Sequence, residues 1–220
     1  MLDGPLEGTP TLLTFDDGGV SAVLYVADML DEFGWKAHFL VTAGQIGKPG
    51  FLNRGQIQEL RRRGHVIGSH SFSHPIRMAH CPTTELNDEW QRSVFLLAEI
   101  LREPIQVASV PGGYYSRRVA HAAARAGIKL LFNSEPVTRF HKVDGCLVLG
   151  RFGAKRSTSP DWTAAIVAGH RQVLVQDYLF WNAKKLAKAL LGQVWLRARV
   201  VLLARRARAT SPISEKDSQK

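Results

Sequence analysis

Four side chains in two short segments could together carry out metal-assisted acid–base chemistry. The segment LLTFDDGG places Asp16 and Asp17 side by side, directly after an apolar run. Adjacent carboxylates repel each other, and in extended backbone they point to opposite faces. The segment HSFSHP places His70 and His74 four residues apart. At this spacing on one helical turn, both imidazoles face the same side and can share one metal ion.

A divalent metal ion accounts for both segments at once. Two histidines four residues apart, taken alone, are more often an ordinary loop. Two imidazoles with one carboxylate, however, form a ligand set that holds a divalent ion and leaves coordination positions open. The ion's charge also offsets the crowding of the two aspartates. One aspartate can then bind the ion, while the other accepts a proton from the water molecule that the ion activates.

An alternation of strands and helices must position these side chains. The apolar runs TLLTF, KAHFLV, HVIGSH, QVASV, KLLFN and CLVLGRF are predicted strands, and the intervening residues 20–33, 56–63, 84–101 and 117–126 have helical patterns. This alternation predicts an α/β fold with parallel strands. The working residues of such folds gather where strands end. The aspartate pair, His70 and the PGGYYS run each follow a predicted strand, so we expect them to converge.

TFDDG followed by HSFSHP resembles the first two motifs of the polysaccharide deacetylases, carbohydrate esterase family four (the NodB-homology domain). The resemblance covers roughly residues 11–152, including ELRRRGHVIGSHSFSHP and TTELNDEWQRSVFLLAEIL. It implies a distorted (β/α) barrel and metal-dependent hydrolysis of N-acetyl or O-acetyl groups on sugars. By matching position, it implies that Asp16 is the general base and that Asp17, His70 and His74 bind one divalent ion. Zinc is the expected ion, and manganese, cobalt or nickel would suit similar ligands.

The loop VPGGYY supplies candidate substrate-binding groups. Gly112 and Gly113 allow close backbone approach, which suits N–H donors to the oxyanion of the reaction. A plain tight turn before the next helix explains the glycines equally well, and the resemblance favours the donor role. Tyr114 and its neighbour Tyr115 either stack on sugar rings or pack against the loop.

Three later motifs depart from the family pattern. Ser109 stands where the family has the arginine that steadies the catalytic aspartate, and residues 134–136 (SEP) replace an aspartate-rich motif. Arg151 stands where a histidine should protonate the leaving amine, yet arginine is a poor general acid and is better suited to bind an anionic group. His141 and His170 are alternative acids. We expect a deacetylase in which a different group serves as the general acid. The alternative is an impaired relative that binds metal and carbohydrate without turnover.

The net charge of +10 is concentrated near the C-terminus. Residues 1–182, expected to form the catalytic barrel, hold 19 basic and 17 acidic residues, which argues against nucleic acid as a partner. Residues 183–208 form a basic amphipathic pattern, which predicts a helical extension. That extension either contacts an anionic membrane surface peripherally or packs on the barrel. Residues 209–220 are polar and expected to be disordered.

Two further features bear on location. Cys81 and Cys146 lie far apart without a C-x-x-C motif, which indicates reduced thiols. The first ten residues lack the basic and apolar regions of a secretory signal. We therefore expect a cytoplasmic protein, with membrane association through the extension. Nothing in the sequence predicts the oligomeric state.

Overall fold

The structure, a computed structural model, describes residues 10–155 and 157–186. The chain divides into two compact units, with the boundary between Asp177 and Tyr178. The helical residues 171–186 cross this boundary. No helix within the described ranges is long and apolar enough to cross a membrane. Most of the predicted extension and all of residues 209–220 lie outside the described residues.

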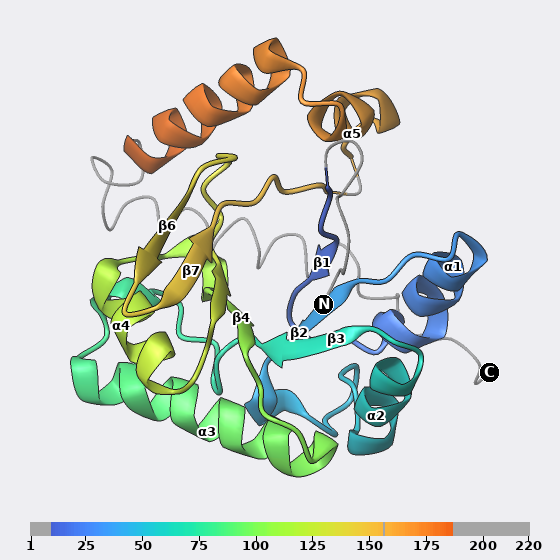
Figure 1. Ribbon diagram of the computed structural model, residues 1–220, viewed down its shortest axis with the longest axis vertical. Helices are drawn as coiled ribbons and strands as arrows, with labels where there is room; N and C mark the ends of the chain where they lie inside the picture. Colours follow the sequence, from blue (N-terminus) through green and yellow to red (C-terminus); the bar gives the residue numbers. More distant parts are fainter. Residues whose placement is uncertain (1–9, 156, 187–220) are drawn as a thin grey trace, which may run out of the picture. The chain divides into compact units, whose positions relative to one another are not determined.

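Seven strands form one sheet in the first unit (Figure 1). They are β1 (Thr14–Phe15), β2 (His38–Val41), β3 (Val66–Ser69), β4 (Val107–Ser109), β5 (Leu130–Phe132), β6 (Phe140–Val143) and β7 (Cys146–Leu149). Their order is β1-β2-β3-β4-β5-β7-β6. Every neighbouring pair is parallel except the antiparallel pair β6–β7. The carboxyl ends of β1 to β5 and β7 therefore meet at one edge of the sheet, as predicted for the working residues.

Helices and single helical turns connect the strands. The longer ones are α1 (Ala27–Glu32), α2 (Arg54–Arg62), α3 (Thr83–Leu101), α4 (Arg117–Arg125) and α5 (Pro160–Val167). The turns are η1 (Ala22–Val26), η2 (Ala43–Gln45), η3 (Met78–His80) and η4 (Pro111–Gly113). Helix α3 contacts β3, α2 and α4, and Figure 1 shows it running along the outer side of the strands. The predicted alternation of strands and helices is thus confirmed.

Local sequence explains where several helices begin. Asn53 and Gln56 form a capping box at α2, and Ser116 accepts a hydrogen bond from the Val119 N–H at the start of α4. Ser159 caps α5 in the same way, accepting a hydrogen bond from the Trp162 N–H. Helix α3 begins one residue before the predicted start at residue 84, after Pro82, and has no side-chain cap.

The core lies between the sheet and α2, α3 and α4. Trp90 of α3 is fully buried with Leu86 and Leu97. Strand β2 buries Phe39, Leu40 and Val41 in succession. Such an unbroken apolar run is typical of a parallel strand covered on both faces.

The predicted α/β deacetylase-type fold is confirmed, with one unpredicted strand. Strand β6 forms a hairpin with β7 through Asp144 and Gly145, whose φ angles of 48° and 81° lie in the left-handed region. Asp-Gly between two strands is a strong hairpin signal, so the sequence did contain the information. Cys81 and Cys146 are free thiols, as predicted.

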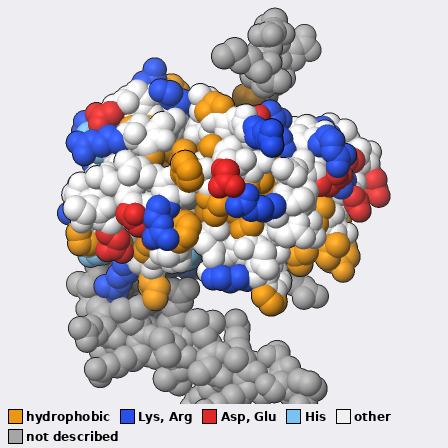
Figure 2. Space-filling model, turned by 90° about the horizontal axis from the view of Figure 1, so that it is seen from below, with side chains coloured by type: hydrophobic (Ala, Val, Ile, Leu, Met, Phe, Trp, Pro, Cys, Tyr) orange, Lys and Arg blue, Asp and Glu red, His pale blue; other side chains and the backbone are white. Residues whose placement is uncertain are grey.

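One face of the molecule mixes both signs of charge. Figure 2 shows acidic and basic side chains side by side on it, among hydrophobic ones. Ion pairs of this kind on α2 and α3 join Arg54 to Glu99 and Arg92 to Asp88. This mixture is what near-equal numbers of acidic and basic residues before residue 183 produce.

Candidate functional site

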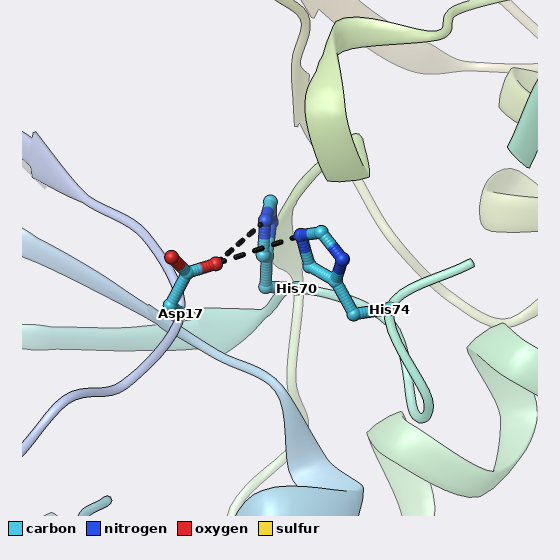
Figure 3. Close-up of side chains that lie close together, drawn as sticks. All are labelled: Asp17, His70 and His74. Carbon is cyan, nitrogen blue, oxygen red and sulfur yellow. Dashed lines mark ion pairs between the residues drawn. The ribbon is translucent and has the colours of Figure 1, made fainter. Parts of the chain in front are cut away.

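The structure brings Asp17, His70 and His74 together at the carboxyl edge of the sheet (Figure 3). Oδ1 of Asp17 lies 3.4 Å from Nε2 of His70 and 3.6 Å from Nε2 of His74. Ligand atoms about 2.1 Å from a tetrahedral zinc ion stand about 3.4 Å apart. The three side chains therefore fit one divalent ion of that size.

The two histidines approach each other through a loop, and not on the helical turn that their spacing also allows. Residues 70–75 have no helical assignment, and both Ser71 and His74 have a φ of 62°. That angle lies in the left-handed region, which side chains other than glycine rarely adopt. The loop, and not helical periodicity, turns both imidazoles toward Asp17, whose own φ is 73°.

Glu89 of α3 holds this loop from behind. Its Oε2 accepts hydrogen bonds from the backbone N–H groups of Phe72, at 2.9 Å, and Ser73, at 2.8 Å. Its Oε1 accepts a third from the Ser73 hydroxyl at 2.6 Å. Glu89 is only 5% exposed, so a buried carboxylate is satisfied entirely by the loop that carries His74.

Ser109, at the end of β4, sets the orientation of His70. Its hydroxyl oxygen lies 2.6 Å from Nδ1 of His70 and 2.9 Å from Oδ1 of Asp16. Because a carboxylate only accepts, the hydroxyl donates to Asp16 and must itself accept from an Nδ1–H on His70. The lone pair of His70 is then on Nε2, which faces Asp17. Burial lowers the pKa of His70 despite the neighbouring carboxylates, and this favours the neutral form that binds metals.

Asp16 points to a different set of partners from its neighbour Asp17. Its Oδ1 and Oδ2 each accept a hydrogen bond from the Arg151 guanidinium, both at 2.8 Å. Burial alone would raise the pKa of Asp16. The hydrogen bonds and charge of Arg151, with smaller effects of His70 and Ser109, outweigh it and hold the pKa below its ordinary value. Asp16 is therefore ionised at neutral pH.

The glycine-rich loop after β4 lies in turn η4. Gly112 and Gly113 have φ angles of 59° and 70°. The N–H of Gly113 donates to Val110 at 3.2 Å, and that of Tyr114 to Pro111 at 3.3 Å. A Cβ on Gly113 would lie 2.6 Å from that of Ser134, so this position requires glycine. Oxyanion and substrate binding by Gly112, Gly113 and Tyr114 remain predictions.

The two candidates for acid or anion contact lie in different surroundings. Arg151 contacts an anionic group of the chain itself, the Asp16 carboxylate. His141, on β6, is exposed, and its Nε2 lies 2.8 Å from the Tyr115 hydroxyl. His170, after α5, is also exposed. An acid role for any of them remains untested.

Sequence reasoning missed two residues of the site. Glu89 lies on the apolar stripe of α3 with Leu86 and Trp90, and a carboxylate at such a position signals a buried partner. Ser109 was considered only as the residue that replaces the family's arginine, and no role was given to its hydroxyl. Its hydrogen bonds to His70 and Asp16 join segments far apart in the chain, and no local pattern announces them.

Comparisons with known proteins agree with the fold and with the first two motifs. The sequence profile described as "Polysaccharide deacetylase" matches residues 3–131, more than half of the chain. The curated Bacillus subtilis (strain 168) protein named "Putative polysaccharide deacetylase YxkH" is 26% identical over 125 residues, which are 57% of this chain and 44% of that protein. The chain thus spans less than half the length of that relative.

Solved structures share the fold. The Streptococcus pyogenes deacetylase PplD in complex with acetate is 24% identical with a TM-score of 0.62, over 68% of this chain and 66% of that one. IcaB from Ammonifex degensii is 23% identical with a TM-score of 0.61, over 74% of this chain and 73% of that one. At these identities the likeness establishes the α/β architecture.

Proposed function

The chain belongs to the polysaccharide deacetylase family, and from this premise we propose that it is a metal-dependent hydrolase that removes acetyl groups from N-acetylated or O-acetylated sugars of a polysaccharide or glycan precursor. The observation that carries the proposal is the convergence of Asp17, His70 and His74 beside the ionised carboxylate of Asp16. The proposed partner is therefore a carbohydrate.

Asp17, His70 and His74 would hold one divalent ion. An ion in such a site polarises the acetyl carbonyl and lowers the pKa of water toward neutrality. Zinc suits two imidazoles and a carboxylate, and manganese, cobalt or nickel would suit similar ligands. Ser109 supports this role by keeping the proton of His70 on Nδ1, so that Nε2 stays free to bind.

Asp16 is the proposed general base. Its Oδ1 accepts from both Ser109 and Arg151, whereas Oδ2 accepts one hydrogen bond, from Arg151. A carboxylate oxygen has two lone-pair sites, so Oδ2 is the atom with room for the proton taken from the attacking water. Backbone N–H groups of the loop at Gly112 and Gly113 are the proposed donors to the oxyanion, and the N–H of Gly113 would have to leave the Val110 carbonyl to take this role.

A second candidate function is binding of metal and carbohydrate without turnover. The observation in its favour is Arg151, which stands where the family resemblance expects a proton-donating histidine and which is paired with Asp16. Arginine stays protonated and cannot supply that proton efficiently. The two candidates share the metal centre and differ only in catalysis.

Acetate release from N-acetylglucosamine oligomers decides between the two candidates. We expect release by the wild type, abolition by a chelator and a loss of about 10²–10⁴-fold in Asp16→Asn, the usual contribution of a general base. Asp88→Asn, an exposed aspartate of α3, is the matched control and should keep full activity. Equal rates for wild type and Asp16→Asn would refute the mechanism, and a metal-loaded but inactive wild type would favour the second candidate.

Elemental analysis tests the metal centre independently of turnover. We expect about one divalent ion per chain in the wild type and in Asp16→Asn, and loss of the ion in His70→Ala and His74→Ala. His141→Ala, which changes an exposed histidine paired with Tyr115, is the control that should keep the ion. Full metal content in both ligand variants would overturn the assignment.

The basic extension 183–208 is proposed to bring a cytoplasmic enzyme to an anionic membrane surface. The sequence pattern of apolar and basic residues supports this, since each basic residue near such a surface contributes about 1 kcal/mol. The full chain should float with anionic liposomes and a chain ending at residue 182 should not. Flotation of the shortened chain would refute this role.

A further inference from the structure

The aspartate pair follows a short strand at one end of the strand order. Strand β1 has two residues, Thr14 and Phe15, and lies at one end of the strand order, where it pairs only with β2. Strand β7 lies toward the other end, between β5 and β6. Within the described part of the chain, therefore, no strand pairing joins β1 to β7.

Arg151, two residues beyond β7, reaches across to the β1 segment. Its guanidinium donates to both carboxylate oxygens of Asp16. Its Nη1 also donates to the Thr14 hydroxyl at 3.1 Å. These partners lie 135 and 137 residues away in the chain. A planar, two-point contact fixes both the position and the rotation of a carboxylate, which a single hydrogen bond does not.

Arg151 is itself held on its other side. Its Nε donates to the Asn133 carbonyl at 3.1 Å, and its backbone N–H donates to Glu135 at 2.9 Å. The preceding Gly150 packs so closely that a Cβ there would lie 2.3 Å from the Glu135 carbonyl oxygen. The guanidinium therefore starts from a fixed backbone, and its side chain is only 14% exposed.

We infer that Arg151 is the positioning residue for Asp16: a side chain that follows β7 contacts the segment of β1, at the far end of the strand order, and fixes the orientation of the base. This inference rests on the proposed function. Four guanidinium N–H groups are committed to Asn133, Thr14 and Asp16. Arg151 therefore acts on the reaction through Asp16 and leaves substrate contacts to other groups.

Steady-state kinetics of Arg151 variants test the inference. Arg151→Ala should lower kcat about 100-fold with KM within about twofold, because misplacing a catalytic group by about 1 Å costs that much and substrate binding is untouched. Guanidinium chloride at tens of millimolar should restore part of this kcat. The kcat of Arg151→Lys should lie between those of the wild type and Arg151→Ala, since an ammonium group cannot make the two-point contact.

Arg61→Ala is the matched control. Arg61 also donates through two nitrogens to a carboxylate, that of Glu103, at 2.6 and 3.0 Å. This pair lies on the surface, and Glu103 follows the end of α3. Its loss should leave kcat unchanged, and guanidinium should have no effect on it. An unchanged kcat in Arg151→Ala, a raised KM with kcat retained, or a kcat loss that guanidinium does not relieve would each overturn the inference.

A stability measurement separates this inference from the proposed function. Urea unfolding of Asp16→Asn, Arg151→Ala and the double variant gives the coupling between the two side chains without any substrate. We expect the double variant's midpoint to lie clearly above the value that adding the two single shifts predicts. Additive shifts would overturn the inference. Coupling in a protein that releases no acetate would leave the pairing intact and refute the proposed function.

Discussion

The Ser109 hydroxyl lies between the two halves of the site. It accepts from His70 and donates to Asp16, so one small side chain links a proposed metal ligand to the proposed base. An outer partner of this kind fixes the histidine tautomer, and its removal typically weakens metal binding about 10- to 100-fold.

Ser109→Ala should therefore bind zinc at least about 10-fold more weakly than the wild type, because only the backbone carbonyl of residue 109, 3.2 Å from Nδ1, then holds the proton of His70 there. Competition with a chromophoric chelator measures this affinity. Ser116→Ala is the control: that serine caps α4, so its loss should cost about 1 kcal/mol of stability and leave zinc affinity unchanged. Wild-type affinity in Ser109→Ala would show that the tautomer is set elsewhere.

At this scale the sequence predicted residue types better than partners. The convergence of Asp17, His70 and His74 follows from motifs at the carboxyl ends of parallel strands, β1 and β3, and the structure contains it. The pairing of Asp16 with Arg151 was not predicted, because it joins residues 135 positions apart and depends on how the sheet brings its ends together. Periodicity and spacing report local geometry, and they contain nothing about such a contact.

The loop that carries both histidines depends on α3 behind it. Glu89→Ala would leave the N–H groups of Phe72 and Ser73 without their acceptor, at a cost of about 1–3 kcal/mol for each buried donor. We expect a loss of about 3 kcal/mol in the free energy of unfolding and weaker zinc binding through His74. Glu99→Ala, an exposed glutamate of the same helix, should cost under about 1 kcal/mol. Urea unfolding measures the free energy of unfolding of both variants, and equal losses would contradict the proposed role of Glu89 in holding the loop.

The turn after Asp17 depends on contact with the end of β2. Gly18 has a φ of 78°, and a Cβ there would lie 2.9 Å from Cγ1 of Val41. Gly18→Ala should lower both stability and zinc affinity, because the turn must shift away from β2. Gly34→Ala carries the same backbone penalty, at a φ of 66°, with nothing within 4 Å. It should cost about 1 kcal/mol without changing zinc affinity, and equal zinc affinities in the two variants would contradict this role of the turn.

Elements with strong periodicity were predicted within a few residues. Helix α3 runs over Thr83–Leu101 where the sequence predicted 84–101, and α4 over Arg117–Arg125 where it predicted 117–126. The conformation of the loop 70–75 was not predicted. Histidine spacing suits a helical turn, but the bonds from Glu89 and the left-handed angles at Ser71 and His74 produce the same proximity from a loop.

Stability of the whole molecule should depend on pH through buried histidines. Burial lowers the pKa of His38, His65 and His70 below the ordinary 6.5. As pH falls below about 6.5, the unfolded chain takes up protons before the folded one, so the free energy of unfolding decreases. The pKa of Asp16 is lowered from 3.8, so its contribution is lost only at more acidic pH.

The metal-free protein should therefore have a lower melting temperature at pH 5 than at pH 7. Thermal unfolding across this range measures the change, and His38→Gln should reduce the slope because it removes one of the three groups. His121→Gln changes a surface histidine paired with Asp144 and should not reduce the slope in the same way. A melting temperature that is constant between pH 5 and 7 would contradict the prediction.

At the scale of the whole chain, the alternation of strand and helix patterns predicted the α/β class, and the distribution of charge predicted a near-neutral body with a basic end. The boundary at residue 182 stays a prediction, because a change in composition indicates where a segment differs without fixing where packing stops. The unit boundary of the structure falls after Asp177, inside the helical residues 171–186.

The left-handed backbone at Asp17, Ser71 and His74 also limits how this protein can change over generations. Glycine is the residue that such angles favour, and each side chain kept there costs about 1–2 kcal/mol. A random library screened only for heat resistance should therefore accumulate glycine at these codons. Selection for turnover must remove the clones that have lost Asp17 or His74, so thermal robustness and function are expected to compete at these two sites.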